Sequence, residues 1–470
     1  MKIKYIAYVS IKMSAFPNSV NYSALPRKAL GSRVSKIQIA PRNASTFSPG
    51  NQIQLQLPTM ANSYVNLGNA YLKFKIKAVG NACHLDHTAY SLFNRITTSS
   101  QSAVLDDLTE AGCLYSSLLD LGMGSASLRD WGKVCLGSDG NPEQSHLGHA
   151  LTTSASVGVA LPFFTGIFNS DKLLPLDTAD GVVFTLYLET ALNSLIADAH
   201  GSLPTGYIIE DVNLHAYIYT LSPESQALLD QSVGEMGYSQ IFESVAHSSD
   251  SKTTGELTKI STLGFRYSSL SKVLITHRAS DNLNDATQLS ISNRSHANMM
   301  EYGLLLGGLP VPERPIVSDP AISDFSEPLS ETLLSFGVLG DKFAQLGLNG
   351  LTQDRLTSDA STDDAFTNHH NRYAVENGHL ADSKDYADIK LHNFAGMGSY
   401  VCAVDCDIVK NAVGGEASNL YSGIDTLGMT CQAKIRYSGA STNSMVIDYY
   451  AFYNSILSLN PITRSWEVSN

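Results

Sequence analysis

Two stretches of alternating apolar and polar residues lie close together in the first part of the chain. Residues 52–57 have the sequence QIQLQL, and residues 71–77 have the sequence YLKFKIK. Side chains repeat every two residues only on a β-strand, so each stretch presents one apolar face and one polar face. An antiparallel sheet with one solvated face requires this pattern. The two stretches therefore predict two strands separated by a long polar turn.

The same alternation returns along the chain up to its C-terminal part. It is found again in residues 182–188, 212–218 and 431–437. These runs are short and are bounded by clusters of Gly, Pro, Asn and Ser, whereas long amphipathic helices are scarce. Many short strands with turn residues between them favour a sandwich or barrel over a fold that alternates strands and helices. We therefore expect an all-β protein.

Length and composition indicate two domains in a protein that has much covered surface. A chain of 470 residues exceeds the size at which one core usually stops growing. Only 16% of the residues are charged and 43% are hydrophobic, which suits large sheets and subunit contacts. No stretch approaches the roughly 20 apolar residues that cross a bilayer. The six cysteines are too sparse for a disulfide scaffold, so folding in a reducing compartment is expected.

Basic residues are concentrated at the N-terminal end. The first 85 residues contain eleven Lys or Arg and no Asp or Glu, whereas the remaining residues carry 20 basic against 44 acidic side chains. A basic arm on an acidic body can contact nucleic acid, an anionic membrane surface or the acidic face of a neighbouring copy. The lysines of residues 73–77 are better explained as the solvated face of a strand. The candidates for an interacting arm are Arg27, Lys28, Arg33, Lys36 and Arg42.

Helix signals and long polar segments suggest how the chain is divided. Ser222 is a suitable N-cap and Pro223 a suitable first helical residue, so a short helix is expected between two β-rich units. A further helical pattern covers residues 326–346, and residues 349–388 are predicted to form a long surface excursion. The start of the chain is interpreted as a strand or arm, or as sequence upstream of a start at Met13. The predicted division is a basic N-terminal arm at 1–46, a first unit at 47–220, a helical connector at 221–236, a second unit at 237–459 and a tail at 460–470.

Catalytic and metal-binding signatures are weak. The sequence contains no G-x-S-x-G elbow, no Walker phosphate loop and no H-E-x-x-H helix. Cys402 and Cys406 would lie about 13 Å apart on a strand, too far to share a zinc ion, so a buried strand is favoured. Other His, Cys and Asp residues could cluster in loops, but they lack a recognisable ligand spacing. These are Cys83, His84, Asp86, His87, His146 and His149, while His369 and His370 are expected to be solvated.

A carbohydrate-active site is a second hypothesis. A glycosidase needs two carboxyl groups that face one cleft, and adjacent acids such as Asp106 with Asp107, or Asp363 with Asp364, point in different directions on a strand or loop. Only two tryptophans are present to form a sugar-stacking surface, at positions 131 and 466. A jelly-roll carbohydrate-binding protein or glycoside hydrolase therefore remains an alternative with little support.

Four segments together resemble a known family. Residues 47–77, 161–189, 302–316 and 445–459 resemble the double jelly-roll major capsid proteins of polinton-like viruses, adintoviruses and virophages. The resemblance follows the order of strand and turn residues and covers most of residues 47–459. Each part also has a local reason, because the prolines at 310, 312 and 315 make a stiff extended segment that suits a subunit contact.

The resemblance implies an architecture and a role. It implies two tandem eight-stranded jelly rolls with short helices and long loop insertions. Three chains would form a homotrimer of pseudo-hexagonal outline, and trimers would tile an icosahedral shell around a double-stranded DNA genome. Neighbouring trimers, penton proteins and minor or cement proteins would be the partners, in a virion capsid assembled inside the host cell. No enzymatic activity, cofactor, metal or small-molecule substrate is implied, and the N-terminal arm would contact DNA or an internal membrane without sequence specificity.

Overall fold

The computed structural model describes most of the two β-rich units and leaves the first 31 residues and several long connections undescribed. Some predictions therefore lie outside the described residues: those for Arg27 and Lys28, for Met13 as a start, for the C-terminal part of the helical pattern at 326–346, and for the excursion at 349–388. Within the described ranges, no helix is long and apolar enough to cross a bilayer. The described residues are 32–100, 103–122, 128–138, 147–170, 172–178, 181–197, 203–233, 238–320, 324–336, 400–407, 423–438, 444–460 and 463–470.

The N-terminal half contains two facing antiparallel sheets, which we name sheet 1a and sheet 1b. In sheet 1a the strand order is β1-β13-β4-β10, with β2 paired to β13 and β9 paired to β4. In sheet 1b the order is β3-β11-β6-β7. Sheet 1a consists of β1 (Ser32–Ile39), β2 (Thr46–Phe47), β4 (Ser63–Val79), β9 (Val157–Pro162), β10 (Leu174–Pro175) and β13 (Gly206–Leu221). Sheet 1b consists of β3 (Gln52–Gln56), β6 (Phe93–Ser99), β7 (Val104–Thr109) and β11 (Val183–Leu188).

The C-terminal half repeats this arrangement in sheets 2a and 2b. The order is β14-β21-β16-β19 in sheet 2a, with β22 paired to β21, and β15-β20-β17-β18 in sheet 2b. Sheet 2a consists of β14 (Tyr238–Lys252), β16 (Leu270–Ala279), β19 (Cys402–Asp405), β21 (Met445–Leu459) and β22 (Trp466–Ser469). Sheet 2b consists of β15 (Thr258–Leu263), β17 (Met299–Leu306), β18 (Leu309–Val317) and β20 (Cys431–Tyr437).

Both halves have jelly-roll topology. We number the eight strands on the main paths of the two sheets of each half along the chain, leaving out β2, β9 and β22, which lie off these paths. One sheet of each half then has the order first, eighth, third, sixth. The facing sheet has the order second, seventh, fourth, fifth. This is the arrangement of a double-sheet jelly roll built from two Greek keys. The predicted double jelly-roll fold is therefore confirmed, and we call the first pair of sheets roll 1 and the second pair roll 2.

The alternating sequence patterns form strands whose apolar side faces the core. On β3, Ile53 and Leu55 are buried between exposed or half-buried glutamines, and on β4 the buried side chains include Phe74 and Ile76. The pattern at 431–437 becomes β20, which alternates buried and more exposed residues throughout. The strands predicted from alternation are all present.

Short helices and one small sheet complete the described structure. The small sheet has the order β12-β5-β8. The expected helix after Ser222 is observed as α5, and the Ser225 amide donates to the Ser222 hydroxyl over 3.3 Å. The elements are β5 (Cys83–Asp86), β8 (Leu147–Leu151), β12 (Leu195–Ala197), α2 (Ala111–Gly122), α4 (Ala191–Ser194), α5 (Pro223–Val233) and α6 (Ser326–Ser335). Short 3-10 turns are η2 (Ala89–Leu92), η5 (Gly166–Asn169) and η7 (Ser280–Asn282), and η3 (Leu128–Leu136) is a π-helix.

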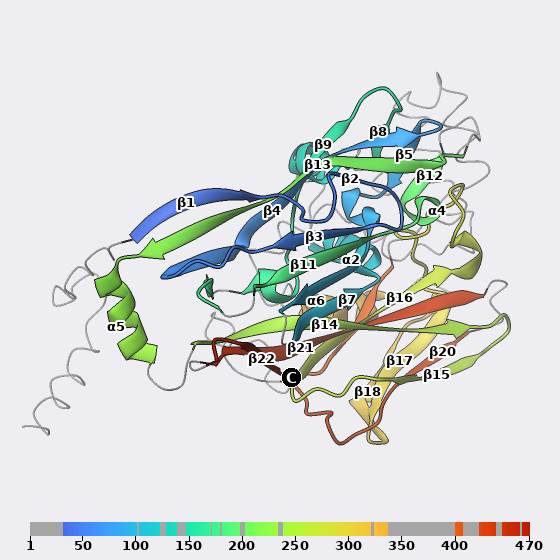
Figure 1. Cartoon of the computed structure of the whole chain (residues 1–470). Coiled ribbons are helices and arrows are strands. Elements are labelled where there is room, and N and C mark those ends of the chain that lie inside the picture. The colour runs from blue at the N-terminus through green and yellow to red at the C-terminus, as the bar shows by residue number, and fades with distance from the viewer. Residues whose placement is uncertain are drawn as a thin grey trace, which may run out of the picture.

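One apolar core runs across both rolls. The larger buried cluster joins side chains from the interior of roll 1 with Phe242, Leu274, Tyr450 and Phe452 of roll 2. A second cluster fills the space between sheets 2a and 2b. In Figure 1 sheet 2a lies directly below β7, α2 and α6, with sheet 2b on its far side. The two rolls are therefore packed against each other along one face of sheet 2a.

Strand β1 consists of residues that were assigned to the N-terminal arm from the sequence. Residues 32–39 were predicted to belong to a basic arm, but they pair with β13 over the whole length of the strand. Figure 1 shows β1, β13 and β4 extending beyond the body of roll 1 towards α5. Arg33 and Lys36 are thus exposed positions on a sheet. The predicted division of the chain into an arm, two units, a connector and a tail stays a proposal.

Candidate functional site: a buried polar seam between the rolls

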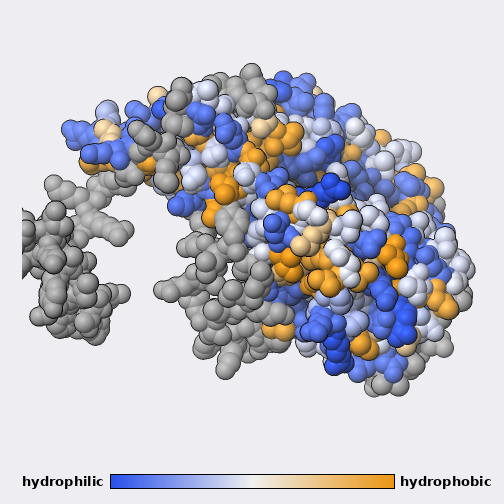
Figure 2. Space-filling model, turned by 90° about the horizontal axis from the view of Figure 1, so that it is seen from below, coloured by the Kyte–Doolittle hydropathy of each residue, from blue (hydrophilic) through white to orange (hydrophobic). Residues whose placement is uncertain are grey.

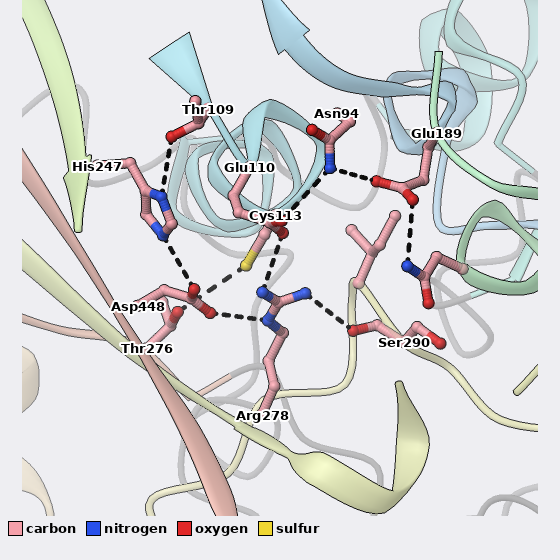
Figure 3. A network of polar contacts seen from close by, with 12 residues as sticks. Asn94, Thr109, Glu110, Cys113, Glu189, His247, Thr276, Arg278, Ser290 and Asp448 are labelled. Carbon is pink, nitrogen blue, oxygen red and sulfur yellow. Dashed lines mark hydrogen bonds and ion pairs between the residues drawn. The ribbon is translucent and has the colours of Figure 1, made fainter. Parts of the chain in front are cut away.

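Charged and polar side chains are buried where roll 1 meets roll 2. We name this region the seam. Roll 1 contributes β7 and α2, and roll 2 contributes β14, β16 and β21 (Figure 3). The partners come from distant parts of the sequence, which tertiary folding brings together. Buried charges are rarely tolerated unless they are paired and hydrogen-bonded, so each group of the seam requires a partner.

Arg278 on β16 is at the centre of the seam. Its Nε donates to Asp448 Oδ2 over 2.8 Å, and its Nη2 donates to Glu110 Oε2 over 3.0 Å. The remaining Nη1 donates to the backbone carbonyl of Ser290 over 3.3 Å. Glu110 belongs to roll 1, whereas Arg278 and Asp448 belong to roll 2. The guanidinium group therefore joins the two rolls through a charge-assisted hydrogen bond.

His247 on β14 continues the network to the other side of Asp448. Its Nε2 lies 3.0 Å from Asp448 Oδ1, and its Nδ1 lies 3.0 Å from Thr109 Oγ1 of roll 1. Burial alone would raise the pKa of Asp448, but Arg278 and His247 beside it lower this pKa to about 2. Asp448 is therefore ionised at neutral pH and can hold both neighbours in place.

Asp106 on β7 makes a separate contact across the seam. Its carboxylate accepts a hydrogen bond from the hydroxyl of Ser244 on β14. Burial raises the pKa of Asp106 to about 6, although the hydrogen bond from Ser244 acts in the opposite direction. Its neighbour Asp107 points the other way and forms a two-point ion pair with Arg95, at 2.7 and 2.6 Å. The two adjacent acids thus do not share one cleft.

A second polar cluster closes the seam near the loop that precedes β17. Arg294 donates to Asp120 of α2, and also to Ser116 Oγ over 2.9 Å. His87 Nε2 lies 3.1 Å from the other oxygen of Asp120. Asp86 accepts a hydrogen bond of 2.7 Å from the Ile291 amide, while burial raises its pKa against the effect of its hydrogen bonds. This cluster therefore ties roll 2 to roll 1 in addition to the Arg278 network and the contact of Asp106.

The seam is suited to fixing geometry. A buried charge pair adds little net stability compared with an apolar contact, but removal of one partner is costly because the other charge stays buried. Such networks therefore disfavour any displacement of one roll relative to the other. The carboxylates of Glu110 and Asp448 are both held by Arg278, and Glu110 also lies 3.4 Å from Asn94 Nδ2. This arrangement holds the two rolls as one body.

The residues considered for a carbohydrate-active site do not come together. Trp466 is buried, whereas Trp131 is 44% exposed and lines an apolar cavity of about 410 Å³ below α2. Among the described residues that line this cavity, Glu243 is the one carboxylate, and it pairs with Lys272 at 2.9 Å. Glycoside hydrolysis uses two facing carboxyl groups. The second acidic pair, at 363 and 364, lies outside the described residues.

The candidate metal ligands have other roles in the described structure. Cys402 and Cys406 are buried on and beside β19, as expected for a buried strand. Asp86 and His87 belong to the seam, and His84 Nδ1 lies 3.2 Å from the carbonyl of Gly148. Within the described ranges, no group of three or more His, Cys, Asp or Glu side chains is placed to hold a metal ion. Positions 146, 369 and 370 lie outside them.

Three of the five predicted arm residues are described, and they do not form one cluster. Arg33 and Lys36 are exposed on β1, and the Lys36 ammonium donates to the Tyr71 hydroxyl over 2.8 Å. Arg42 follows β1 and donates to the side chains of Gln54 and Gln56 on β3, at 2.9 and 3.2 Å. A role of these residues in binding DNA or a membrane remains a prediction.

Reasoning from the sequence missed the seam as a connected site. More than a hundred residues separate each of Glu110, Arg278 and Asp448 from the next. Each follows or lies within a strand pattern that shows no unusual motif. One weak signal exists, because charged residues at apolar-facing strand positions are rarely buried without a partner. Arg278 follows the apolar run at 273–275 in β16, and Asp448 interrupts an apolar and aromatic run at 445–453 in β21.

Two jelly rolls in one chain, joined along a buried face, define a double jelly-roll protein. No family model matches the sequence, and no curated protein matches it. Solved structures with the same fold include chains of viral capsids. The chain is similar to a chain of the PBCV-1 virus capsid, with a TM-score of 0.56, 8% identity, and coverage of 96% of this chain and 99% of the other.

Two further structures show the same similarity. A chain of the Sputnik virophage matches with a TM-score of 0.55 and 10% identity, covering 96% of this chain and 91% of the other. The Faustovirus major capsid protein matches with a TM-score of 0.52 and 8% identity, covering 96% of this chain and 94% of the other. At these identities the similarity establishes the fold. The double jelly-roll architecture extends over nearly the whole chain in each case.

Proposed function

We propose that this chain is a viral major capsid protein that assembles as homotrimers. The observation that carries the proposal is the repeat of one jelly-roll topology in two rolls that share one core. Three copies of a two-roll body around a three-fold axis present six similar wedges, so that one protein can fill a hexagonal lattice. The seam supports this role, because the two wedges must keep a fixed relative position. Viral capsid chains with the same fold support it as well.

The proposal extends to the particle. Trimers tile an icosahedral shell that encloses a double-stranded DNA genome, in contact with neighbouring trimers and with penton and minor or cement proteins. The shell is assembled inside the host cell. The work of such a protein is self-association through large, well-packed interfaces, with no chemical turnover. The residues before β1, together with Arg33, Lys36 and Arg42, form the basic end from which contacts with DNA or a membrane would start.

The solution mass of the purified full chain tests this proposal. One chain has a mass of 50.6 kDa, and we expect a species of three times that mass across a range of protein concentrations. Closed point-group symmetry favours such a discrete species over a broad distribution. A chain that stays single at all concentrations, and forms neither sheets nor shells when it is concentrated, contradicts the proposal.

A further inference from the structure

The space between roll 1 and sheet 2a is not filled along its whole length. Alternate side chains of β14 share one face of the sheet, and on this face His247 takes part in the seam. Val245 and Glu243 lie two and four residues earlier on the same face, and both line the apolar cavity of about 410 Å³ below α2. Figure 1 shows α2 and α6 above this side of sheet 2a. The cavity therefore continues the joint between the two rolls beyond the seam.

Four aromatic side chains line this cavity. Phe452 of β21 and Phe336, which directly follows α6, meet edge to face with 5.4 Å between their ring centres. Phe164 and Trp131 contribute two further rings from roll 1, and Trp131 is 44% exposed. Protein interiors leave few voids larger than a water molecule, and ligand pockets typically have volumes of roughly 300–1,000 Å³. The size and the walls of the cavity are thus those of a small-molecule site.

The cavity differs from the apolar areas of the outer surface. Figure 2 shows the face seen from below, on which apolar side chains lie in separate patches among hydrophilic ones. Such scattered apolar side chains are normal on a folded protein. In the cavity, by contrast, rings from both rolls converge on one concave space. Convergence of this kind distinguishes a ligand site from ordinary exposed apolar surface.

One carboxylate belongs to the wall of the cavity. Glu243 Oε1 accepts hydrogen bonds from the Lys272 ammonium over 2.9 Å and from the Ser271 hydroxyl over 3.0 Å. For Glu243 Oε2, the described chain provides no hydrogen-bond donor. The Lys272 ammonium lies 4.9 Å from the ring centres of both Phe336 and Phe452, and Lys272 is not among the lining residues. The described lining residues include no Lys, Arg or His, so the charged atom available to a ligand is a carboxylate oxygen.

We propose that this cavity binds a small amphipathic amine, a molecule with an apolar body and one ammonium group. The apolar body packs against Val245, Leu119 and the aromatic rings, while the ammonium donates a hydrogen bond to Glu243 Oε2. The faces of aromatic rings attract cations as well. An anionic ligand of the same shape would meet a like charge and find no lining cation to pair with. The bound amine contacts both rolls and strengthens their joint, and the site does not depend on the proposed trimer.

The intrinsic fluorescence of the full chain tests this inference. The chain has two tryptophans, of which Trp131 lines the cavity and Trp466 is buried elsewhere, so a ligand in the cavity changes the emission of Trp131. The probes are n-octylamine and octanoate, which share one chain length and carry opposite charges at neutral pH. We expect octylamine to shift the emission to shorter wavelength and to bind about tenfold more tightly than octanoate, because it gains a charge-assisted hydrogen bond.

Two variants locate the site. Glu243→Gln removes the charge and should reduce the preference for octylamine over octanoate to about twofold or less. Val245→Phe places a larger side chain in the cavity and should weaken the binding of both probes. Glu301→Gln removes the carboxylate that pairs with Arg436 on sheet 2b, so this matched control should leave both affinities unchanged. Circular dichroism verifies that each variant is folded, and Glu243→Gln decides the question if Val245→Phe does not fold.

The outcomes test the site and its chemistry separately. Equal affinities of the two probes for the unmodified chain, or an octylamine preference that Glu243→Gln leaves intact, would overturn the assignment of the ammonium to Glu243. An emission of Trp131 that neither probe changes would overturn the site itself. These measurements need a folded chain only, so their result is distinct from the success or failure of the proposed trimer.

Discussion

Arg278 is the side chain on which the seam depends most, because it satisfies carboxylates from both rolls at once. Replacement by methionine keeps much of the side-chain volume. It leaves the carboxylates of Asp448 and Glu110 without the guanidinium group that both of them contact. We expect Arg278→Met to lower the free energy of unfolding by about 3–5 kcal/mol, the usual cost of breaking a buried pair. Thermal or urea unfolding of the purified chain measures this change.

An exposed ion pair provides the control for Arg278. Arg436 on β20 pairs with Glu301 at 3.0 Å, and its side chain is 50% exposed. Because solvent screens such pairs, Arg436→Met should cost about 0–1 kcal/mol. If the two substitutions destabilise the protein equally, the seam does not hold the rolls in the manner described.

The raised pKa of Asp106 predicts that the stability of the folded chain depends on pH. Its pKa in the folded chain is about 6, above the ordinary value of 3.8, so the group contributes stability that is fully present below the ordinary value and is lost as the pH rises through 6. We expect the protein to gain about 1–1.5 kcal/mol from this group between about pH 7.5 and about pH 5. The pKa of Asp448 is lowered instead, so its contribution declines only at more acidic pH.

The variant Asp106→Asn isolates this contribution. It cannot ionise at position 106, so its stability should change less over the same pH interval than that of the unmodified chain. Melting temperatures of both proteins, recorded in the same buffers, give the comparison. Equal pH dependence in the two proteins would show that Asp106 is not the titrating group.

At the scale of elements, helix α5 is held to the extended end of roll 1 by a small tyrosine network. The Tyr238 hydroxyl donates to Asp230 Oδ1 over 2.7 Å and lies 2.9 Å from the Tyr64 hydroxyl. Tyr238→Phe removes these bonds and should cost about 1 kcal/mol locally. We expect faster amide hydrogen exchange in residues 223–233, with little change in the global melting temperature.

A second tyrosine serves as the comparison for Tyr238. Tyr187 on β11 lies beside the Arg95 guanidinium, 5.4 Å from the ring centre, and the described structure shows no hydrogen bond of its hydroxyl. Tyr187→Phe should leave the exchange of α5 unchanged. If both substitutions leave α5 equally protected, the helix is held by other contacts.

The elements that the sequence predicts well are those whose burial alternates. β3 and β20 each bury every second residue, so the period-two pattern is visible without knowledge of their neighbours. β1 was not predicted as a strand, because its apolar residues Val34, Ile37 and Ile39 are unevenly spaced and mostly lie in a half-exposed sheet. Pairing with β13 fixes this strand, and such a partner cannot be identified from local sequence.

The seam lies beyond local prediction for the same reason. Asp86 bonds to residues more than two hundred positions away, and Tyr450 donates to the carbonyl of Glu110 over 3.1 Å. Contacts between such distant residues depend on topology, which the sequence indicated only through the resemblance of its segments to double jelly-roll capsid proteins. That resemblance correctly implied two rolls, but not the side chains that join them.

At the scale of the whole molecule, the two rolls share one apolar core. A shared core and two polar clusters fix roll 1 on sheet 2a, while β1 and β18 remain exposed at opposite ends of the repeat. This arrangement is consistent with the self-association proposed for the chain.

Electron microscopy of the purified full chain shows whether it assembles as a trimer of double rolls. We expect compact particles with a six-sided outline in top view, produced by three chains with two rolls each, and hexagonal sheets or closed shells at higher concentration. Two-fold particles, or open filaments built from single rolls in succession, would contradict it.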